Sequence, residues 1–447
     1  MKKLREPSSA TLGREYYKYV VPSIATVVLG GFYTIVDGIF VGRAMGDVGL
    51  AAINIAWPFM TLILATGTGI GTGGAALFSI RRGGKDRDGA ASVRGDTISL
   101  LLVSVLLIMI SLFTFQRPLL KILGAGDDPL LMSMAVDYTN VVVGGCFFQI
   151  FGLGLSPLLR NDSKPRLAML IMVAGLVTNI GLDYLFIMVF GWGLTGAAVA
   201  TVCSQLVTAI PCFINLASEN SFVGRLRLKD MRLSSREVKG ILTTGISPFG
   251  TAITYGLIII LNNYATLRYG GTAGLAAYSV MLYVIHPIIN LQSGIGDGIQ
   301  PLVSKAYGAG DTAGMEWHLR KALLHSITFG CLVIVALLPS RYAISSFFGA
   351  SDLVADYIAQ GFFYTAFAFP LTGLIRVMTA FMYATGKPMR ASVIIYSDAF
   401  ITTPLMLGLL PVFFGLNGIW MAYTASQLLL TALTVTLWRR QGRQKTT

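Results

Sequence analysis

Charged residues are scarce in this chain of 447 residues, since Asp, Glu, Lys and Arg make up only 12% of it. Soluble globular domains carry about a quarter of their residues as charges, so that class is excluded. Hydrophobic residues reach 54%, and apolar runs of about 20 residues, enough to cross a bilayer as a helix, recur along the chain. They predict an all-α integral membrane protein with twelve spans, at 16–41, 50–79, 95–117, 130–158, 166–190, 194–218, 237–267, 275–305, 318–338, 352–384, 391–414 and 417–438.

Histidine and cysteine are also rare, with three and four copies. His286, His318 and His325 are scattered without the spacing of a metal site. The cysteines fall inside predicted spans, where a free thiol behaves as a small hydrophobe. The sequence also lacks a phosphate-binding loop of the Walker type. We therefore expect neither an enzyme nor an ATP-driven pump, and no cofactor.

Acidic residues are few beside the 34 lysines and arginines, which leaves a formal net charge of +13. If the N-terminus is cytoplasmic, 28 of those 34 cationic residues lie in cytoplasmic segments and five on the opposite face. This bias is the positive-inside pattern of membrane proteins, which explains the excess charge without nucleic-acid binding. It predicts a multi-pass protein of the cell membrane with both termini in the cytoplasm.

Parts of the sequence occur twice. The tetrapeptide at 49–52 returns at 274–277, and the glycine-rich segment 69–73 returns at 294–298, both 225 residues later. Six spans return a chain to its starting side, so the two copies are expected to have parallel topology. The sequence thus predicts two pseudo-symmetric six-helix bundles around a central cleft. The expected domains are an interfacial segment 1–15, an N-lobe 16–218, a cytoplasmic linker 219–236, a C-lobe 237–438 and a cytoplasmic tail 439–447.

Two carboxylates fall inside predicted spans of the first half. Asp37 lies late in the first span, and Asp183 lies in the fifth, one helical turn after Asn179. Thr201, in the sixth span, is expected at the depth of Asp183 across a short turn. An acid at this depth is costly, and it usually faces a cavity or a partner.

The second half lacks these acids. The repeat places Asn262, Thr402 and Met406 where the first half has Asp37, Asn179 and Asp183. A requirement of the fold would persist in both copies, so a function peculiar to the first half is favoured. Two acids that share an apolar pocket repel when both are ionised, which suits proton uptake and release. The same oxygens would also coordinate a hard monovalent cation, and the residues do not choose between H⁺ and Na⁺.

The chain resembles the multidrug and toxic compound extrusion (MATE) transporters, and within them the prokaryotic branch with an acidic residue in helix 1. The resemblance covers essentially the whole chain, including glycine-rich second and eighth spans. Its motifs lie at 36–42, 49–52, 179–183, 196–198, 300–301 and 415–420. It implies a secondary active antiporter that exports cationic amphipathic drugs in exchange for H⁺ or Na⁺ by alternating access. The implied coupling site in the N-lobe is Asp37, Tyr138, Asn179, Asp183 and Thr201. The alternative is a lipid-linked saccharide flippase of the same superfamily, which would need several cationic residues inside the helices; Arg376 alone qualifies.

Aromatic, polar and methionine side chains in the spans are candidates to bind substrate. They are Tyr33, Tyr255, Asn262, Met281, Tyr283, His286 and Asp297. Arg376 and Asp398 lie at similar depth on neighbouring spans, which predicts a structural ion pair. The expected partners are small cationic or amphipathic substrates and the lipid bilayer, with a monomeric protein and no nucleic acid. No metal is expected beyond Na⁺ at the coupling site.

Overall fold

The computed structural model describes residues 9–125, 129–347 and 351–443, and within these the side chains of 32–39, 42, 46–48, 50, 124 and 440–443 lie outside the description. The described chain is nearly all helix and contains no strand, which confirms the predicted class. Its helices are α1 Ser9–Gly83, α2 Arg87–Leu120, η1 Lys121–Ala125, α3 Pro129–Gly144, α4 Cys146–Asn161, α5 Pro165–Asp183, η2 Tyr184–Val189, α6 Gly193–Ala217, η3 Leu228–Asp230, α7 Ser235–Gly308, α8 Thr312–Phe347, α9 Asp352–Thr365, η4 Ala366–Ala368, α10 Phe369–Ala384, α11 Pro388–Ser397, η5 Asp398–Thr402, α12 Thr403–Phe414 and α13 Leu416–Arg443.

Nine helices of the described chain are long and apolar enough to cross a membrane, or ten if the bent pair α3 and α4 is one span. Helices α1 and α7 have 75 and 74 residues, about 110 Å at 1.5 Å per residue. Since the hydrocarbon core is about 30 Å thick, each of them contains more than one crossing. In α7 the helix breaks at Gly271, where φ is 59° and ψ is −156°, a conformation that glycine adopts readily. The count of twelve spans stays a prediction.

The chain forms two compact units. The N-terminal unit comprises Ala25–Ala252 with Ser304–Gly310. The C-terminal unit comprises the described residues up to Ile24, Ile253–Val303 and those from Asp311 onward. The start of α1 thus packs with the second half of the chain, and the start of α7 packs with the first. The predicted lobe boundaries, 16–218 and 237–438, follow the sequence, whereas the compact units exchange these helix ends.

Repeated glycines explain where the exchanged ends pack. A Cβ at Gly73 of α1 would overlap the carbonyl oxygen of Ile241 in α7, inside the N-terminal unit. In the C-terminal unit, a Cβ at Gly298 of α7 would lie 2.6 Å from the Cα of Val20 in α1. Gly73 and Gly298 are repeat equivalents, so each copy uses the same glycine to admit a helix backbone that a larger residue would exclude.

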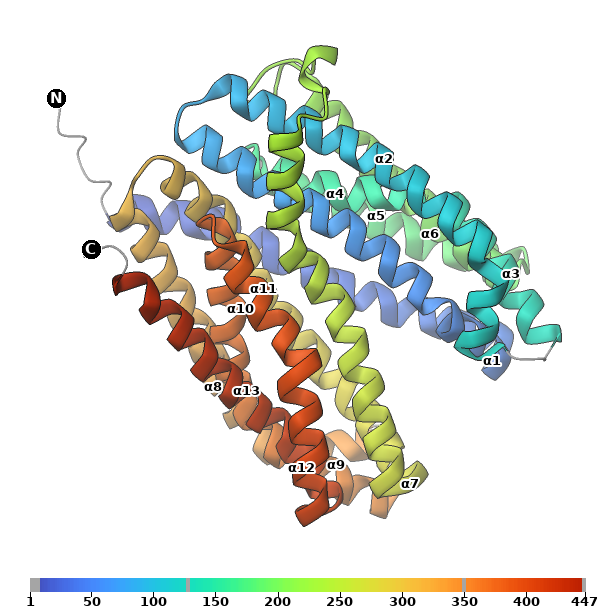
Figure 1. The fold of residues 1–447 in the computed structure, drawn as a ribbon. Coiled ribbons are helices and arrows are strands. Elements are labelled where there is room, and N and C mark those ends of the chain that lie inside the picture. The colour runs from blue at the N-terminus through green and yellow to red at the C-terminus, as the bar shows by residue number, and fades with distance from the viewer. Residues whose placement is uncertain (1–8, 126–128, 348–350, 444–447) are drawn as a thin grey trace. The chain divides into compact units, whose positions relative to one another are not determined.

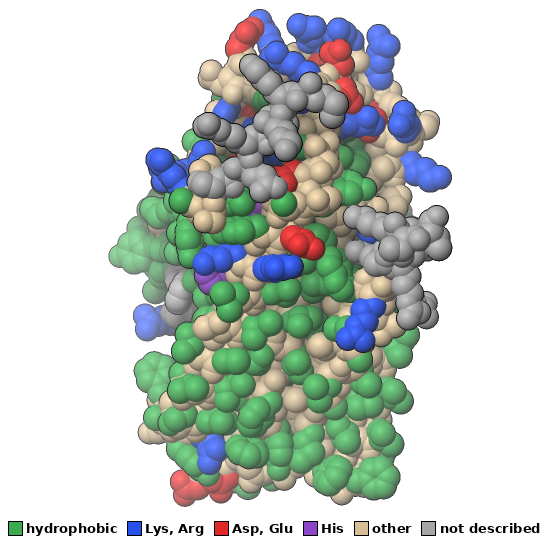
Figure 2. All heavy atoms as spheres, turned by 90° about the vertical axis from the view of Figure 1, so that its left-hand side faces the viewer, with side chains coloured by type: hydrophobic (Ala, Val, Ile, Leu, Met, Phe, Trp, Pro, Cys, Tyr) green, Lys and Arg blue, Asp and Glu red, His purple; other side chains and the backbone are tan. Residues whose placement is uncertain are grey.

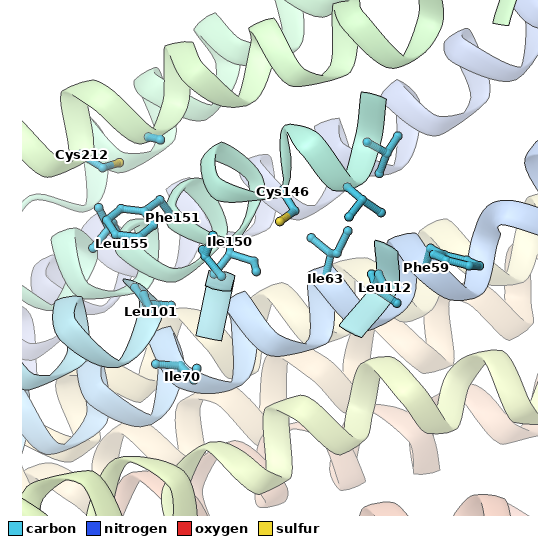
Figure 3. Close-up of a cluster of buried hydrophobic side chains, with 14 of the residues drawn as sticks. Phe59, Ile63, Ile70, Leu101, Leu112, Cys146, Ile150, Phe151, Leu155 and Cys212 are labelled. Carbon is cyan, nitrogen blue, oxygen red and sulfur yellow. The ribbon is translucent and has the colours of Figure 1, made fainter. Parts of the chain in front are cut away.

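Buried apolar side chains fill each unit. In the N-terminal unit, Phe59 and Ile63 of α1 join Leu101 of α2 and Ile150 of α4 in one continuous cluster, which Figure 3 shows in close-up. Figure 1 shows α8, α10, α11 and α13 of the C-terminal unit running side by side. Two further buried clusters lie in that unit.

Large apolar side chains also cover much of the outer surface. Leu106, Leu107 and Ile110 of α2 are 61%, 62% and 65% exposed. On the face drawn in Figure 2, hydrophobic side chains cover much of the surface between the lysines and arginines. An apolar flank is expected of helices that face lipid, because lipid tails are as apolar as a protein core.

The segment that joins α6 to α7 is fixed against the N-terminal unit. The fully buried Arg94 of α2 donates to the carbonyl oxygens of Leu216, Gly224 and Arg225 at 2.8, 2.6 and 3.3 Å. Asp96, two residues further along α2, accepts the N–H groups of Leu233 and Ser234 at 2.8 and 3.2 Å. The predicted linker is therefore a folded strap that holds the first turns of α7.

Candidate functional site

The membrane-embedded acid Asp183 is the last residue of α5. It has no exposed surface, and Asn179, one turn earlier on the same face, is 1% exposed. The helix continues from Asp183 into the π-helical segment η2. Such π-turns occur often at functional sites, and this one follows directly after the acid.

The amide of Asn179 is buried without a hydrogen bond to any residue that the structure describes, through either Nδ2 or Oδ1. Leaving a buried polar group unsatisfied costs about 1–3 kcal/mol. Native proteins retain such a cost where the group has a ligand or a function to serve. Asn179 is therefore a candidate to bind an ion or a water molecule.

Tyr138 comes from α3 and Thr201 from α6. Tyr138 of α3 is 4% exposed and Thr201 of α6 is 3% exposed. Helix α6 packs against both α3 and α5. The structure thus buries four of the five predicted coupling residues on three contacting helices. The fifth, Asp37, belongs to α1, and its side chain lies outside the described residues.

A pocket in the N-terminal unit reaches Asn179. It is lined from α1, α5 and α6 by Thr26, Leu29, Gly30, Met172, Val173, Gly175, Leu176, Asn179, Ser204, Gln205 and Thr208. Five of these lining side chains carry hydroxyl or amide groups, so polar groups interrupt a mostly apolar wall. Sequence reasoning missed Ser204, Gln205 and Thr208 as pocket residues. Their spacing of one and four residues along α6 is the signal that could have found them.

Gly175 lets α5 and α6 close around this pocket. A Cβ at Gly175 would overlap Cγ2 of Thr208 and would lie 3.2 Å from the carbonyl oxygen of Ser204. The hydroxyl of Thr208 donates to the carbonyl oxygen of Gln205 at 2.8 Å. The repeat places Asp398 at the position of Gly175 and Gln427 at that of Gln205, so the C-terminal unit fills the same place with a carboxylate.

The predicted substrate-binding residues are dispersed. The side chain of Tyr33 lies outside the described residues. The hydroxyl of Tyr255 lies 2.5 Å from Nδ1 of His286, and both side chains are partly exposed. The amide of Asn262 donates to the carbonyl oxygen of Ile258 in its own helix at 2.8 Å.

The remaining three differ in exposure. Met281 is fully buried in an apolar cluster with Trp420, which favours a packing role. Tyr283 is 55% exposed, and Asp297 is partly exposed.

The predicted ion pair of Arg376 and Asp398 is not formed, because no nitrogen of Arg376 lies within 4.0 Å of the carboxylate. The carboxylate instead accepts hydrogen bonds from Thr403 Oγ1 at 3.0 Å and Gln427 Nε2 at 3.5 Å. Asp398 begins the π-helical segment η5. The wider π-turn brings the residue five positions later, Thr403, to the same face. Sequence reasoning assumed regular α-helix there.

Known proteins share both the sequence pattern and the fold. A family model described as MatE matches residues 22–185 and 249–407. The multidrug export protein MepA of Staphylococcus aureus (strain MSSA476) is 24% identical over 432 residues, covering 95% of this chain and 93% of that protein. MepA of Staphylococcus saprophyticus is 23% identical over 415 residues, covering 93% of this chain and 90% of that protein.

Among solved structures, an outward-facing multidrug resistance MATE family transporter superposes with a TM-score of 0.91 at 21% identity, covering 98% of this chain and 97% of that one. A MATE structure in complex with MaL6 gives a TM-score of 0.90 at 21% identity and covers 98% of both chains. These likenesses show the fold. The two segments matched by the family model fall one in each repeat and together make up most of the chain, so the protein belongs to the MatE family, the multidrug and toxic compound extrusion transporters.

Proposed function

We propose that this protein is a secondary active antiporter of the cell membrane, which exports cationic amphipathic compounds in exchange for H⁺ or Na⁺. In this proposal the ion binds in the N-terminal unit, at Asp37, Tyr138, Asn179, Asp183 and Thr201. The curated relatives are multidrug export proteins along nearly their whole length, which supports small-molecule export.

The observation that carries the proposal is the burial of Asp183 beside the unsatisfied amide of Asn179. An ionised carboxylate deep in an apolar bundle is costly unless it is neutralised. A proton or a Na⁺ ion neutralises it, and either is released when water reaches the site. The pocket lined by α1, α5 and α6 includes Asn179, and its polar side chains support such access.

Alternating access then couples the movement of the ion to the movement of the cargo. A neutralised site is more stable when closed to water, and an ionised site is more stable when hydrated, so ion occupancy biases which state is populated. The shift in population is limited by the difference in ion affinity of the two states. Cargo that favours the opposite state is thereby exchanged for the ion.

The test is transport by the full-length protein in liposomes, with an imposed pH gradient or an imposed Na⁺ gradient and a fluorescent cation as cargo. We expect one of the gradients to drive uptake, and Asp183→Asn or Asp37→Asn to reduce it to the level of protein-free liposomes. Asp137→Asn is the matched control, because Asp137 lies on α3 of the same unit with an exposed side chain. Uptake that depends on neither gradient would refute antiport. If Asn262→Ala abolishes driven uptake and Asp183→Asn does not, the coupling site lies in the C-terminal unit.

A further inference from the structure

A stripe of polar side chains runs along one face of α6 from the predicted coupling residue Thr201. Ser204 follows Thr201 by three residues and Thr208 follows it by seven, which places all three on the same side of the helix. Their side chains are 3%, 4% and 3% exposed, so the stripe is buried in an apolar bundle. Polar side chains buried at membrane depth are a mark of ion and proton pathways.

The stripe leads from the coupling residues toward the strap that joins α6 to α7. Helix α6 ends at Ala217, directly before the strap. Helix α5 begins at the same end, because Asp162, three residues before the helix, accepts the N–H of Phe222 in the strap at 2.9 Å. The pocket extends from Asn179 back to Met172 on α5, and so toward this strap end. This is the side predicted to face the cytoplasm.

The two hydroxyl groups of the stripe present acceptors to the pocket. Ser204 Oγ donates to the carbonyl oxygen of Thr201 at 2.7 Å, and Thr208 Oγ1 donates to that of Gln205 at 2.8 Å. A hydroxyl whose hydrogen is used within its own helix keeps its oxygen lone pairs for a ligand and has no hydrogen left to donate. Such oxygens favour a cation or a protonated water over an anion.

The C-terminal unit does not repeat the stripe. The repeat places Ser426 at the position of Ser204 and Leu430 at that of Thr208. Leu430 is 1% exposed and belongs to an apolar cluster. The same helix therefore packs well with leucine at this position. The hydroxyl of Thr208 is not a requirement of the fold, which favours a function specific to the N-terminal unit.

The stripe meets an apolar closure one turn beyond Thr208. Cys212 and Leu216 continue the same face of α6, and both are fully buried in the apolar cluster of the N-terminal unit. Figure 3 shows Cys212 among the side chains of that cluster. The polar lining thus reaches from Asn179 to Thr208 and is shut at Cys212 in this structure.

We propose that Ser204, Gln205 and Thr208 form the route by which the coupling cation passes between Asn179 and the strap end of the N-terminal unit, with the closure at Cys212. The oxygens of the route replace part of the water around the cation, and the apolar closure prevents a leak when it is shut. The inference rests on the proposed function in treating the cation on this route as the coupling ion.

The test is the rate at which Cys212 of the purified full-length protein reacts with two thiol reagents, measured by mass spectrometry of the peptide that contains it. Aminoethyl methanethiosulfonate is a cation, and sulfonatoethyl methanethiosulfonate is an anion. We expect Cys212 to react at least about tenfold faster with the cation, after each rate is divided by that with free cysteine. Thr208→Val removes one hydroxyl at nearly constant size, and it should slow the cationic reagent about tenfold, as expected for one lost hydrogen bond.

Thr195→Val is the matched control, because Thr195 lies at the other end of α6 with an exposed side chain, and it should change neither rate. A Cys212 that does not react with the cation, equal rates with both reagents, or a Thr208→Val rate equal to the wild type overturns the route. If Thr208→Val does not fold, the preference of the wild type for the cation decides. Labelling needs neither cargo nor an ion gradient, so failure of antiport leaves this result intact.

Transport in liposomes separates a residue on the route from a residue at the coupling site. Thr208→Val should lower the maximal rate of ion-driven uptake about tenfold. The ion concentration that gives half of that rate should change by less than about twofold, because the coupling site keeps its ligands. An unchanged maximal rate, or a loss of ion affinity alone, contradicts the route.

Discussion

At the scale of single residues, the site combines a buried acid with a buried amide that the fold leaves unsatisfied. Asp183 and Asn179 lie four residues apart in an apolar span, which was enough to predict that they share one helix face. The structure buries both side chains. The coupling role of this pair stays a prediction. The partners of Asp398 were beyond sequence reasoning, because a π-turn changes which residues share a face and its presence depends on packing.

The unsatisfied amide leads to a prediction about stability and transport together. Asn179→Leu replaces it with an apolar side chain of similar size, so the free energy of unfolding should rise by about 1 kcal/mol or stay unchanged. Ion-driven transport should nevertheless be lost. Thermal unfolding in detergent and liposome uptake measure the two effects.

Asn215→Leu is the control, since Asn215 of α6 already donates to the carbonyl oxygen of Pro211 at 3.0 Å and lies outside the pocket. If Asn179→Leu lowers stability and leaves transport intact, the amide has a structural role and the account of this residue is wrong.

At the scale of elements, helix crossings depend on a few glycines. The sequence showed the glycine-rich segments as a repeat. It did not show which helix packs against each segment, because contacts between distant parts of the chain leave no local pattern. Gly73 and Gly298 admit backbones from the opposite repeat. By contrast, a Cβ at Gly30 of α1 or at Gly256 of α7 would meet nothing within 4 Å.

Two alanine substitutions distinguish a glycine that admits a neighbouring backbone from a glycine that faces open space. Gly73→Ala should lower the free energy of unfolding by about 1–3 kcal/mol, because the added methyl meets the backbone of α7. Gly256→Ala in α7 should raise it by about 0.5–1 kcal/mol, since nothing lies within 4 Å of the new methyl and alanine favours the helix. Thermal unfolding of the purified variants measures both stability changes. If the two substitutions change stability in the same direction, Gly73 does not admit the backbone of α7.

The strap before α7 gives a second prediction at this scale. Arg94→Met leaves buried carbonyl oxygens of Leu216 and Gly224 without their donor, so unfolding should become easier by about 3 kcal/mol. Arg87→Met, at an exposed position of the same helix, should stay within about 0.5 kcal/mol of the wild type. Limited proteolysis at residues 219–234 should be faster in Arg94→Met alone. Equal cleavage of both variants would show that the strap is held by other contacts.

At the scale of the whole molecule, one duplicated unit has diverged in its acids. The N-terminal unit keeps Asp183 where the repeat has Met406, and the C-terminal unit keeps Asp398 where the repeat has Gly175. The sequence predicted the repeat, the membrane class and the family. It did not predict that each compact unit includes the first turns of a helix from the other half, because that exchange arises only in tertiary packing.

The most direct measurement of this division is ion movement driven by cargo in liposomes that contain a pH-sensitive or Na⁺-sensitive dye. An imposed gradient of a fluorescent cation should move H⁺ or Na⁺ in the opposite direction in the wild type and in Asp398→Asn. The same gradient should move no ion in Asp183→Asn, because the buried carboxylate that the ion neutralises is gone. Coupled ion movement that persists in Asp183→Asn and disappears in Asp398→Asn would contradict the assignment of coupling to the N-terminal unit.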